Sequence, residues 1–462
     1  MSIRQRMRDY ATEKIVSEIM SHVATASTRN IVRMIRLGEK LTTDEEYRER
    51  TAELRRLFEQ GHPSAILVKD VISRLSPRVR ERLIRNLFIN ALLTGINTRK
   101  QILHDEGWQP PQFVVISPTM RCNLHCPGCY AGEYDQEEGL PLELIDRILT
   151  ECKELGMYFN TMSGGEVLTR KDIFDVWRKH DDMYFQIYTN GTAINERTAD
   201  KLAELGNVAP MVSLEGFEAE TDERRGKGTF AKVMRAFDLM KERGMVFGAS
   251  LTETRSNIET IGSEEFVDMC VEKGCMVLWY FQYIPIGRCP SLDLMPTAAQ
   301  RDWLRRRVRE LRDSRPVFIG DFWNDGPYVH GCIAGGREYL HINAKGDIEP
   351  CVFCHFAVDN IRNTSLRDAI NSPFMRRIRS RQPYRDNLLT PCMLIDSPDV
   401  LRSVVSEFKA RPTCEGAEEL ITDFADEIDR YAEEYRRYAD PAWDAEKSRE
   451  AEQPAEAASN ER

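Results

Sequence analysis

The stretch that decides the fold is PTMRCNLHCPGCYAG, residues 118–132, which directly follows a short apolar run at 113–117. It places Cys122, Cys126 and Cys129 in a C-x3-C-x2-C spacing, and the Asn, Pro and Gly between them predict a loop. Three thiolates from one loop can hold three irons of a [4Fe–4S] cluster, which leaves the fourth iron open to a small molecule. A zinc site would more often be closed by four ligands. The spacing therefore favours a cluster with an open iron.

Around this loop, short apolar runs alternate with amphipathic segments. A parallel sheet with right-handed crossovers is the usual result of such repeated units. Six units predict an α/β fold, an open partial (β/α)6 TIM-like barrel rather than a closed eightfold one, with its chemistry where the strands end. The expected strands are 113–117, 158–162, 185–189, 209–214, 246–251 and 276–284.

The remaining segments divide the 462 residues unequally. Ile15, Ile19 and Val23 recur at helical spacing near the N-terminus. In the C-terminal part, Tyr339 to Ile348 carries a hairpin signal. We predict a helical N-terminal region at 1–110, the barrel at 111–320, a small cluster-binding extension at 321–414, an acidic helix at 415–447 and a disordered tail at 448–462.

Composition narrows the class and the compartment. Hydrophobic residues are 42% of the chain, which is enough for a large core and too much for a disordered protein. The longest nearly apolar stretch, Leu87 to Ile96, is too short to span a bilayer, and the opening MSIRQRMRDYATEK lacks the apolar core of a signal peptide. A cytoplasmic location is therefore expected, where the twelve cysteines are more typical of metal binding or burial than of disulfides.

Charge is distributed unevenly. Residues 1–110 carry 20 Lys or Arg against 14 Asp or Glu, and residues 415–462 carry 6 against 16. The basic N-terminal helices are compatible with peripheral contact at the inner face of a membrane, although a solvated helix face explains the same pattern. The sequence contains no nucleic-acid-binding motif beside this charge, so no nucleic-acid partner is expected.

The cysteine loop, closed by the aromatic Tyr130, resembles the signature of the radical SAM superfamily. The resemblance implies that the open iron binds S-adenosylmethionine (SAM), which is cleaved to methionine and a 5′-deoxyadenosyl radical that takes a hydrogen atom from a substrate. It also implies a reducing partner such as a ferredoxin or flavodoxin. The resemblance covers roughly residues 112–290.

Further motifs follow the expected strands in the family's order. Met162 to Glu166 looks like the family's GGE motif, Tyr188 to Thr192 is similar to its TNG turn, and Ser213 to Gly216 has Glu where Asp is commoner. Asp222 to Gly226 resembles the D-x-x-R-G element, whose arginine would pair with the SAM carboxylate. The resemblance thus implies these cofactor-binding residues: Tyr130, Gly164, Gly165, Glu166, Thr189, Asn190, Ser213, Glu215 and Arg225.

A second cysteine group begins at Cys332. The stretch GDIEPCVFCH, which holds Cys351 and Cys354, resembles the auxiliary-cluster extension of the SPASM and twitch families. With at most five cysteines here, one auxiliary [4Fe–4S] cluster is favoured, bound by Cys332, Cys351, Cys354 and Cys392. Cys414 competes with Cys392 for the fourth position, and a structural zinc site is the other reading of a C-x2-C pair with two distant cysteines.

The main hypothesis is a radical SAM enzyme whose substrate is unidentified. Three classes of substrate are open. We lean slightly to a lipid or other long apolar substrate, because the basic N-terminal region could dock on an anionic membrane. The alternatives are a peptide-modifying maturase and a small-metabolite enzyme. The rival hypothesis is a different class of protein, a non-catalytic iron–sulfur protein for electron transfer or sensing. Such a protein would need neither the open iron nor the GGE and D-x-x-R-G elements.

Overall fold

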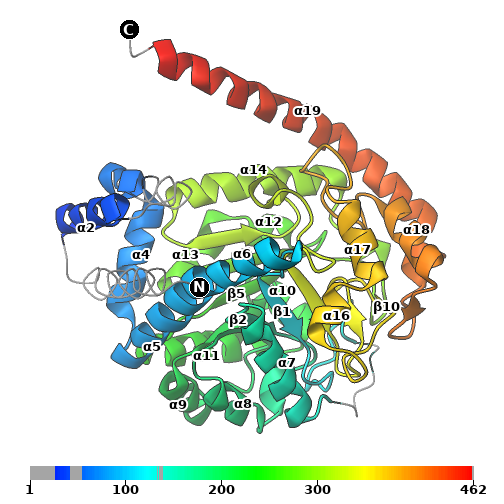
Figure 1. The fold of residues 1–462 in the computed structure, drawn as a ribbon, viewed down its shortest axis with the longest axis horizontal. Helices are drawn as coiled ribbons and strands as arrows, with labels where there is room; N and C mark the ends of the chain where they lie inside the picture. Colours follow the sequence, from blue (N-terminus) through cyan, green and yellow to red (C-terminus); the bar gives the residue numbers. More distant parts are fainter. Residues whose placement is uncertain (1–26, 42–51, 53–54, 133, 135–138, 460–462) are drawn as a thin grey trace.

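The computed structural model describes residues 27–41, 52, 55–132, 134 and 139–459. Within these residues a nine-stranded sheet runs in the order β7-β6-β5-β4-β3-β2-β1-β8-β9 (Figure 1). The strands are β1 (Phe113–Ile116), β2 (Phe159–Met162), β3 (Tyr184–Thr189), β4 (Val208–Leu214), β5 (Gly248–Glu253), β6 (Val277–Gln282), β7 (Phe318–Asp321), β8 (Tyr339–Ile342) and β9 (Ile348–Glu349).

Strands β1 to β7 pair in parallel, which confirms the predicted partial barrel. The six expected strands are present, and two more parallel strands extend the sheet at its ends. β7 has only four residues, and β8 belongs to the expected hairpin, whose second strand, β9, pairs with it antiparallel. Sequence reasoning missed that β8 also pairs in parallel with β1, in a register that joins Phe113 to Tyr339. The C-terminal extension is therefore continuous with the barrel sheet.

Amphipathic helices cover the outer face of the barrel. α14 begins with a reciprocal capping box between Thr297 and Gln300, and its buried face includes Leu304, Val308 and Leu311. The helices are α7 (Leu142–Glu154), α8 (Ile173–Lys179), α9 (Glu196–Leu205), α10 (Glu218–Arg225), α11 (Thr229–Glu242), α12 (Ile258–Ile261), α13 (Glu264–Glu272) and α14 (Ala298–Ser314), with 3-10 turns η2 (Val167–Thr169) and η3 (Leu292–Leu294).

The described part of the N-terminal region consists of helices. Ile31, Ile35, Phe58 and Ile72 form a small core of their own. The predicted repeat of Ile15, Ile19 and Val23 lies outside the described residues. The elements are α2 (Thr28–Leu41), α4 (Pro63–Arg74), α5 (Pro77–Arg82), the π-helix η1 (Leu83–Thr94) and α6 (Gly95–Glu106).

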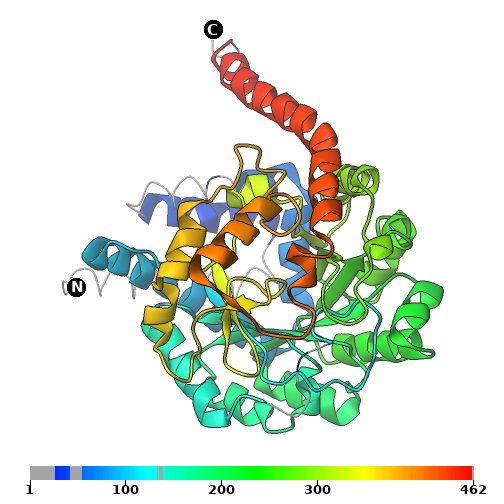
Figure 2. The same ribbon diagram turned by 90° about the vertical axis from the view of Figure 1, so that its right-hand side faces the viewer.

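The C-terminal extension lies across the ring of barrel elements, as the yellow and orange segments of Figure 2 show. It contains α15 (Gly326–Val329), α16 (Leu366–Ile370), α17 (Pro373–Ser380), α18 (Pro398–Phe408), η4 (Glu419–Ile421), α19 (Ala425–Ser459) and a small antiparallel pair, β10 (Phe356–Ala357) with β11 (Arg411–Pro412). None of the described helices is both long and apolar enough to cross a membrane.

The long helix α19 corrects one expectation. Residues 448–459, expected as disordered, continue this helix, whose Ala- and Glu-rich sequence has high helix propensity. Its first half packs against α14, where the Arg301 guanidinium lies 3.7 Å from the centre of the Tyr435 ring. Its last turns project away from the body (Figures 1 and 2).

Candidate active site

The first cysteine loop leaves the end of β1 and lines a cavity of about 890 Å³. Cys122, Cys126 and Cys129 line the cavity and form no disulfide, and Cys126 is the most buried of the three. The Cys122 thiol accepts a hydrogen bond from the Leu124 amide at 3.4 Å, and the Asn190 side-chain amide lies 3.8 Å from it. Burial raises the pKa of the Cys122 and Cys129 thiols, so bound metal would have to stabilise their thiolate forms.

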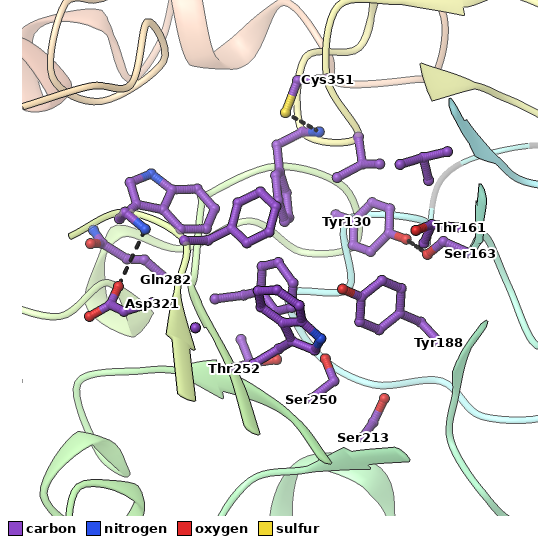
Figure 3. Close-up of a pocket in the computed structure, with 18 of the residues that line it drawn as sticks. Tyr130, Thr161, Ser163, Tyr188, Ser213, Ser250, Thr252, Gln282, Asp321 and Cys351 are labelled. Carbon is purple, nitrogen blue, oxygen red and sulfur yellow. Dashed lines mark hydrogen bonds between the residues drawn. The ribbon is translucent and has the colours of Figure 1, made fainter. Parts of the chain in front are cut away.

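Tyr130 continues this loop into the middle of the cavity (Figure 3). Its hydroxyl lies 2.5 Å from the hydroxyl of Ser163, the residue directly after β2. Its ring packs edge-on against the Phe353 ring, with the ring centroids 5.3 Å apart. Burial raises the pKa of Tyr130 to about 12, so the phenol stays protonated at neutral pH. Tyr130 therefore links the first cysteine loop, the β2 turn and the C-terminal extension.

Gly164 and Gly165 form the turn after β2 and line the cavity. Gly164 has φ +109°, and a Cβ on Gly165 would collide with the carbonyl oxygens of Met120 and Arg121. The Gly165 amide donates to the Thr119 carbonyl at 3.0 Å. These glycines let the β2 turn press against the cysteine loop.

Glu166 faces away from the cavity, unlike its neighbours in the motif. Its fully buried carboxylate accepts hydrogen bonds from the Thr189 hydroxyl at 2.8 Å, the Asn190 amide at 2.7 Å and the Leu168 amide at 3.0 Å. Burial raises the pKa of Glu166 despite these donors. In this structure the carboxylate of Glu166, named above among the cofactor-binding residues, is directed to these three donors. Glu166 instead holds the turn that carries Thr189 and Asn190, which line the cavity.

Two arginines at the end of α10 share one carboxylate beside the cavity. Arg224 Nη1 lies 2.8 Å and Arg225 Nε lies 2.6 Å from Oε1 of Glu215. Both arginines and Ser213 line the cavity, whereas Glu215 is buried behind them. Because two cations face one anion, this wall keeps a net positive charge, which suits an anionic group such as a carboxylate.

The second cysteine group contributes to the lining of the same cavity. Cys332, Cys351 and Cys392 line it. Cys354 is 1% exposed, and its backbone pairs with that of Cys351 in an isolated antiparallel β-bridge. Burial raises the pKa of all four thiols, that of Cys351 to about 12. Each thiol also raises the pKa of another thiol in the group or has its own pKa raised by one. Three thiols on one cavity wall, with Cys354 next to Cys351, supply the four sulfur donors of a fully cysteine-ligated [4Fe–4S] cluster.

Cys414 lies apart from these four. Its thiol is 3.1 Å from Nδ1 of His355, whose Nε2 is 3.1 Å from the Val352 carbonyl. It packs beside Met120 and Tyr134 rather than with Cys392. This placement favours Cys392 over Cys414 as the fourth ligand.

Sequence reasoning missed the aromatic wall between the two cysteine groups. Gln186 bridges the Tyr188 hydroxyl at 3.0 Å and the Trp279 indole nitrogen at 3.2 Å inside the barrel. Polar or aromatic residues recurring at every second position of β3 and β6 were the available signal, because alternate residues face the barrel interior. The aromatic residues on the wall are Phe113, Phe159, Tyr188, Trp279, Phe281, Phe322, Trp323, Tyr339 and Phe353.

Comparison with known families agrees with both cysteine groups. Residues 116–252 match the sequence model of the radical SAM superfamily, and residues 332–393 match that of SPASM, an iron–sulfur cluster-binding domain. The first range contains Cys122, Cys126 and Cys129, and the second contains Cys332 to Cys392. The cofactors are therefore SAM with a [4Fe–4S] cluster, and an auxiliary iron–sulfur cluster.

The alignments with curated relatives span most of the length of those proteins. The chain is 24% identical to the AdoMet-dependent heme synthase of Oleidesulfovibrio alaskensis, over 61% of this chain and 80% of that protein. It is 25% identical to the PqqA peptide cyclase of Granulibacter bethesdensis, over 63% and 81%. It is 27% identical to the mycofactocin maturase MftC of Mycobacterium ulcerans, over 60% and 79%.

Solved structures share the fold. SuiB of Streptococcus suis bound to S-adenosylmethionine aligns with a TM-score of 0.54 at 21% identity, over 65% of this chain and 76% of that one. The protein anSMEcpe with bound AdoMet aligns with a TM-score of 0.51 at 17% identity, over 72% and 97%. The cavity, its two cysteine groups and the two family matches lead to one conclusion: the chain is an enzyme of the radical SAM superfamily that carries a SPASM domain after its barrel.

Proposed function

We propose that this enzyme takes a hydrogen atom from a peptide substrate, one of whose apolar or aromatic side chains enters the cavity between the two cysteine groups. When bound, SAM and the first cluster would supply the 5′-deoxyadenosyl radical. The residues of the chain would position both reactants. Arg224 and Arg225 would meet the SAM carboxylate, the glycine turn after β2 would meet its amino group, and the aromatic wall would hold the substrate side chain.

The observation that carries the proposal is one cavity reached by both cysteine groups, with a mainly apolar lining that includes many aromatic rings. Its volume of about 890 Å³ lies within the range of small-molecule sites, roughly 300–1,000 Å³. Aromatic walls also exclude water, which protects a reactive radical from side reactions. An apolar side chain beside SAM suits this space better than a highly charged metabolite does.

The rim of the cavity offers an apolar surface for the rest of a peptide. Phe318, Tyr328 and Val329 line the cavity and are 50%, 63% and 40% exposed. Exposed apolar groups of this kind mark binding grooves when they gather at one place. A peptide segment next to the reacting residue would cover them.

The open edge of β7 limits how such a peptide could bind. Arg312 Nε donates to the Ile319 carbonyl at 2.8 Å, and the Asp321 amide donates to Asp325 Oδ2 at 2.8 Å. These side chains occupy backbone groups that an added strand would need. We therefore expect the peptide to be held through side-chain contacts at the rim rather than as an extra strand on β7.

The comparisons support a peptide more than a lipid. Among the relatives are a PqqA peptide cyclase and a mycofactocin maturase, and SuiB has been solved bound to its precursor peptide SuiA, with a TM-score of 0.54. The heme synthase among the relatives is an exception to the peptide theme. The preference for a lipid substrate and a membrane contact finds no support among these proteins, and it now depends only on the apolar cavity and the basic N-terminal region.

The test uses the full-length enzyme with both clusters assembled, SAM and dithionite, under anaerobic conditions. Release of 5′-deoxyadenosine is measured after addition of either a small-peptide fraction or a lipid extract of the cells that make the protein. We expect the peptide fraction to stimulate release, and protease treatment of that fraction to remove the stimulation. The Cys126→Ala variant in every arm reports release that does not depend on the first cluster.

Stimulation by the lipid extract alone, unchanged by protease, would overturn the peptide proposal and restore the lipid alternative. Protease-resistant stimulation by the small-molecule part of the peptide fraction would overturn it in favour of a metabolite.

A further inference from the structure

One thiol of the second cysteine group receives a hydrogen bond from a tyrosine hydroxyl. The Tyr339 hydroxyl donates to Cys351 Sγ at 2.9 Å, and the Phe353 amide lies 3.5 Å from the same sulfur. The hydroxyl of Tyr384, by contrast, donates to the sulfur of Met393 at 3.5 Å. At the first loop, Cys122 instead accepts the Leu124 amide at 3.4 Å.

The sheet fixes the position of Tyr339. It is the first residue of β8 and pairs in register with Phe113 of β1, and the two rings stack with centroids 5.3 Å apart at an angle of 3°. The side chain is nearly fully buried, 2% exposed, and its ring forms part of the cavity wall. A side chain held this firmly keeps its hydroxyl aimed at one sulfur, as a precise hydrogen bond requires.

The hydroxyl can act only as a donor towards this sulfur. A phenol, with an ordinary pKa of about 10, keeps its proton at neutral pH. A thiolate that binds iron carries no proton and therefore accepts the bond. The direction of the hydrogen bond follows from these two facts.

We propose that Tyr339 raises the reduction potential of the auxiliary cluster by donating its hydroxyl hydrogen to the Cys351 thiolate. Reduction places one more negative charge on the cluster and its sulfurs. A hydrogen bond to sulfur stabilises the reduced form more than the oxidised form, because the sulfur is then more negative. Tyr339 is a positioning residue in this role, since it acts through the cluster ligand.

The inference rests on the auxiliary cluster and not on the identity of the substrate, so it can fail while the peptide proposal stands. The experiment is a redox titration of the full-length enzyme with both clusters assembled, followed by electron paramagnetic resonance. Added SAM perturbs the signal of the first cluster, and the signal that SAM leaves unchanged reports the auxiliary cluster. Iron content is measured for each variant.

In Tyr339→Phe we expect the equilibrium constant for reduction of the auxiliary cluster to fall roughly tenfold, which is about 59 mV for one electron. Tyr184→Phe is the matched control, because the Tyr184 hydroxyl is buried on β3 with no hydrogen-bond partner among the described residues. Its potential should equal that of the unmodified enzyme.

An unchanged or raised potential in Tyr339→Phe, at full iron content, would overturn the proposal. An equal fall in Tyr184→Phe would also overturn it, because the shift would then follow from any buried phenol. Should Tyr339→Phe lose the auxiliary cluster, Tyr339→Leu, which also removes the donor to Cys351, decides the outcome by the same criterion.

Discussion

The two cysteine groups face the same cavity but are built in opposite ways. The first takes three thiols from eight consecutive residues of one loop, at the end of β1. The second gathers four thiols spread over residues 332–392, which only the folded extension brings together. A local ligand set can keep one iron open, because the loop ends before a fourth ligand is reached. A dispersed set encloses its metal and needs the surrounding fold to hold it.

The surroundings of the two groups also differ, because the first borders the cavity wall and the second is held by the buried core. The first group lies beside a glycine turn and two arginines on the cavity wall, which suit a small charged ligand. The second is tied into the core. The Cys392 amide donates to Asp396 Oδ2 at 3.0 Å, and Asp396 forms a fully buried ion pair with Arg301. The surroundings of the first group therefore suit a site that binds and releases a ligand, and those of the second group suit a cluster that stays bound.

The largest effect should follow from removing a ligand of the first group. Cys126→Ala should abolish release of 5′-deoxyadenosine, because the cluster that would bind SAM is lost. Iron should fall from about eight to about four per chain, with the auxiliary cluster retained. Iron analysis and the SAM-insensitive resonance signal check this. Loss of all iron would contradict the independence of the two groups.

The next effect separates Cys392 from Cys414. Cys392→Ala should lose about four irons and keep SAM-dependent release of 5′-deoxyadenosine in the absence of substrate. Cys414→Ala should keep about eight irons, because that thiol lies with His355 and apart from the other four. The reverse result would place Cys414 among the ligands. Zinc in place of the second set of irons would exclude the auxiliary cluster.

The buried pair behind the second group predicts a large loss of stability. Arg301 and Asp396 are both fully buried, with Nη1 and Oδ1 2.6 Å apart. Asp396→Ala leaves an unpaired buried cation, which should cost about 3–5 kcal/mol of unfolding free energy. Thermal unfolding of the assembled enzyme measures it. Asp175→Ala, which breaks the exposed pair between Arg178 and Asp175, is the control and should leave the midpoint nearly unchanged.

Sequence patterns predicted the first group far better than the second. Residue spacing fixed Cys122, Cys126 and Cys129 on one loop, because ligands that are close in the chain need no tertiary information. The choice between Cys392 and Cys414 depended on how loops fold over the barrel, which no local pattern contains. The barrel was predictable from alternating apolar runs, but β8 was not assigned to its sheet, since its pairing with β1 joins residues far apart in sequence.

Motifs also predicted which residues gather at the site better than they predicted which way each side chain faces. Glu166 lies where the GGE motif placed it, yet its carboxylate is directed to the Thr189 turn. The phenol of Tyr339 gave no signal at all, because an aromatic residue in a strand ordinarily indicates core packing. Orientation depends on neighbouring elements, and a single sequence does not record it.

The smallest effect tests the charged wall of the first group. Arg225 lines the cavity and pairs with Glu215, so Arg225→Ala should weaken SAM binding roughly tenfold to a hundredfold, the worth of one charge-assisted hydrogen bond. Equilibrium binding of SAM to the oxidised enzyme measures the dissociation constant. Arg235→Ala, on the exposed side of α11, removes the same charge away from the cavity and should leave it unchanged.

The effect should stay confined to the first group. Arg225→Ala should retain about eight irons and an unshifted auxiliary potential, because Arg225 contacts neither Cys351 nor Cys392. Arg224 remains beside Glu215 in this variant, with Nη1 2.8 Å from Oε1, and keeps part of the positive charge. Complete loss of SAM binding would therefore show that Arg225 also supports the loop itself, and unchanged binding would assign the carboxylate to Arg224 alone.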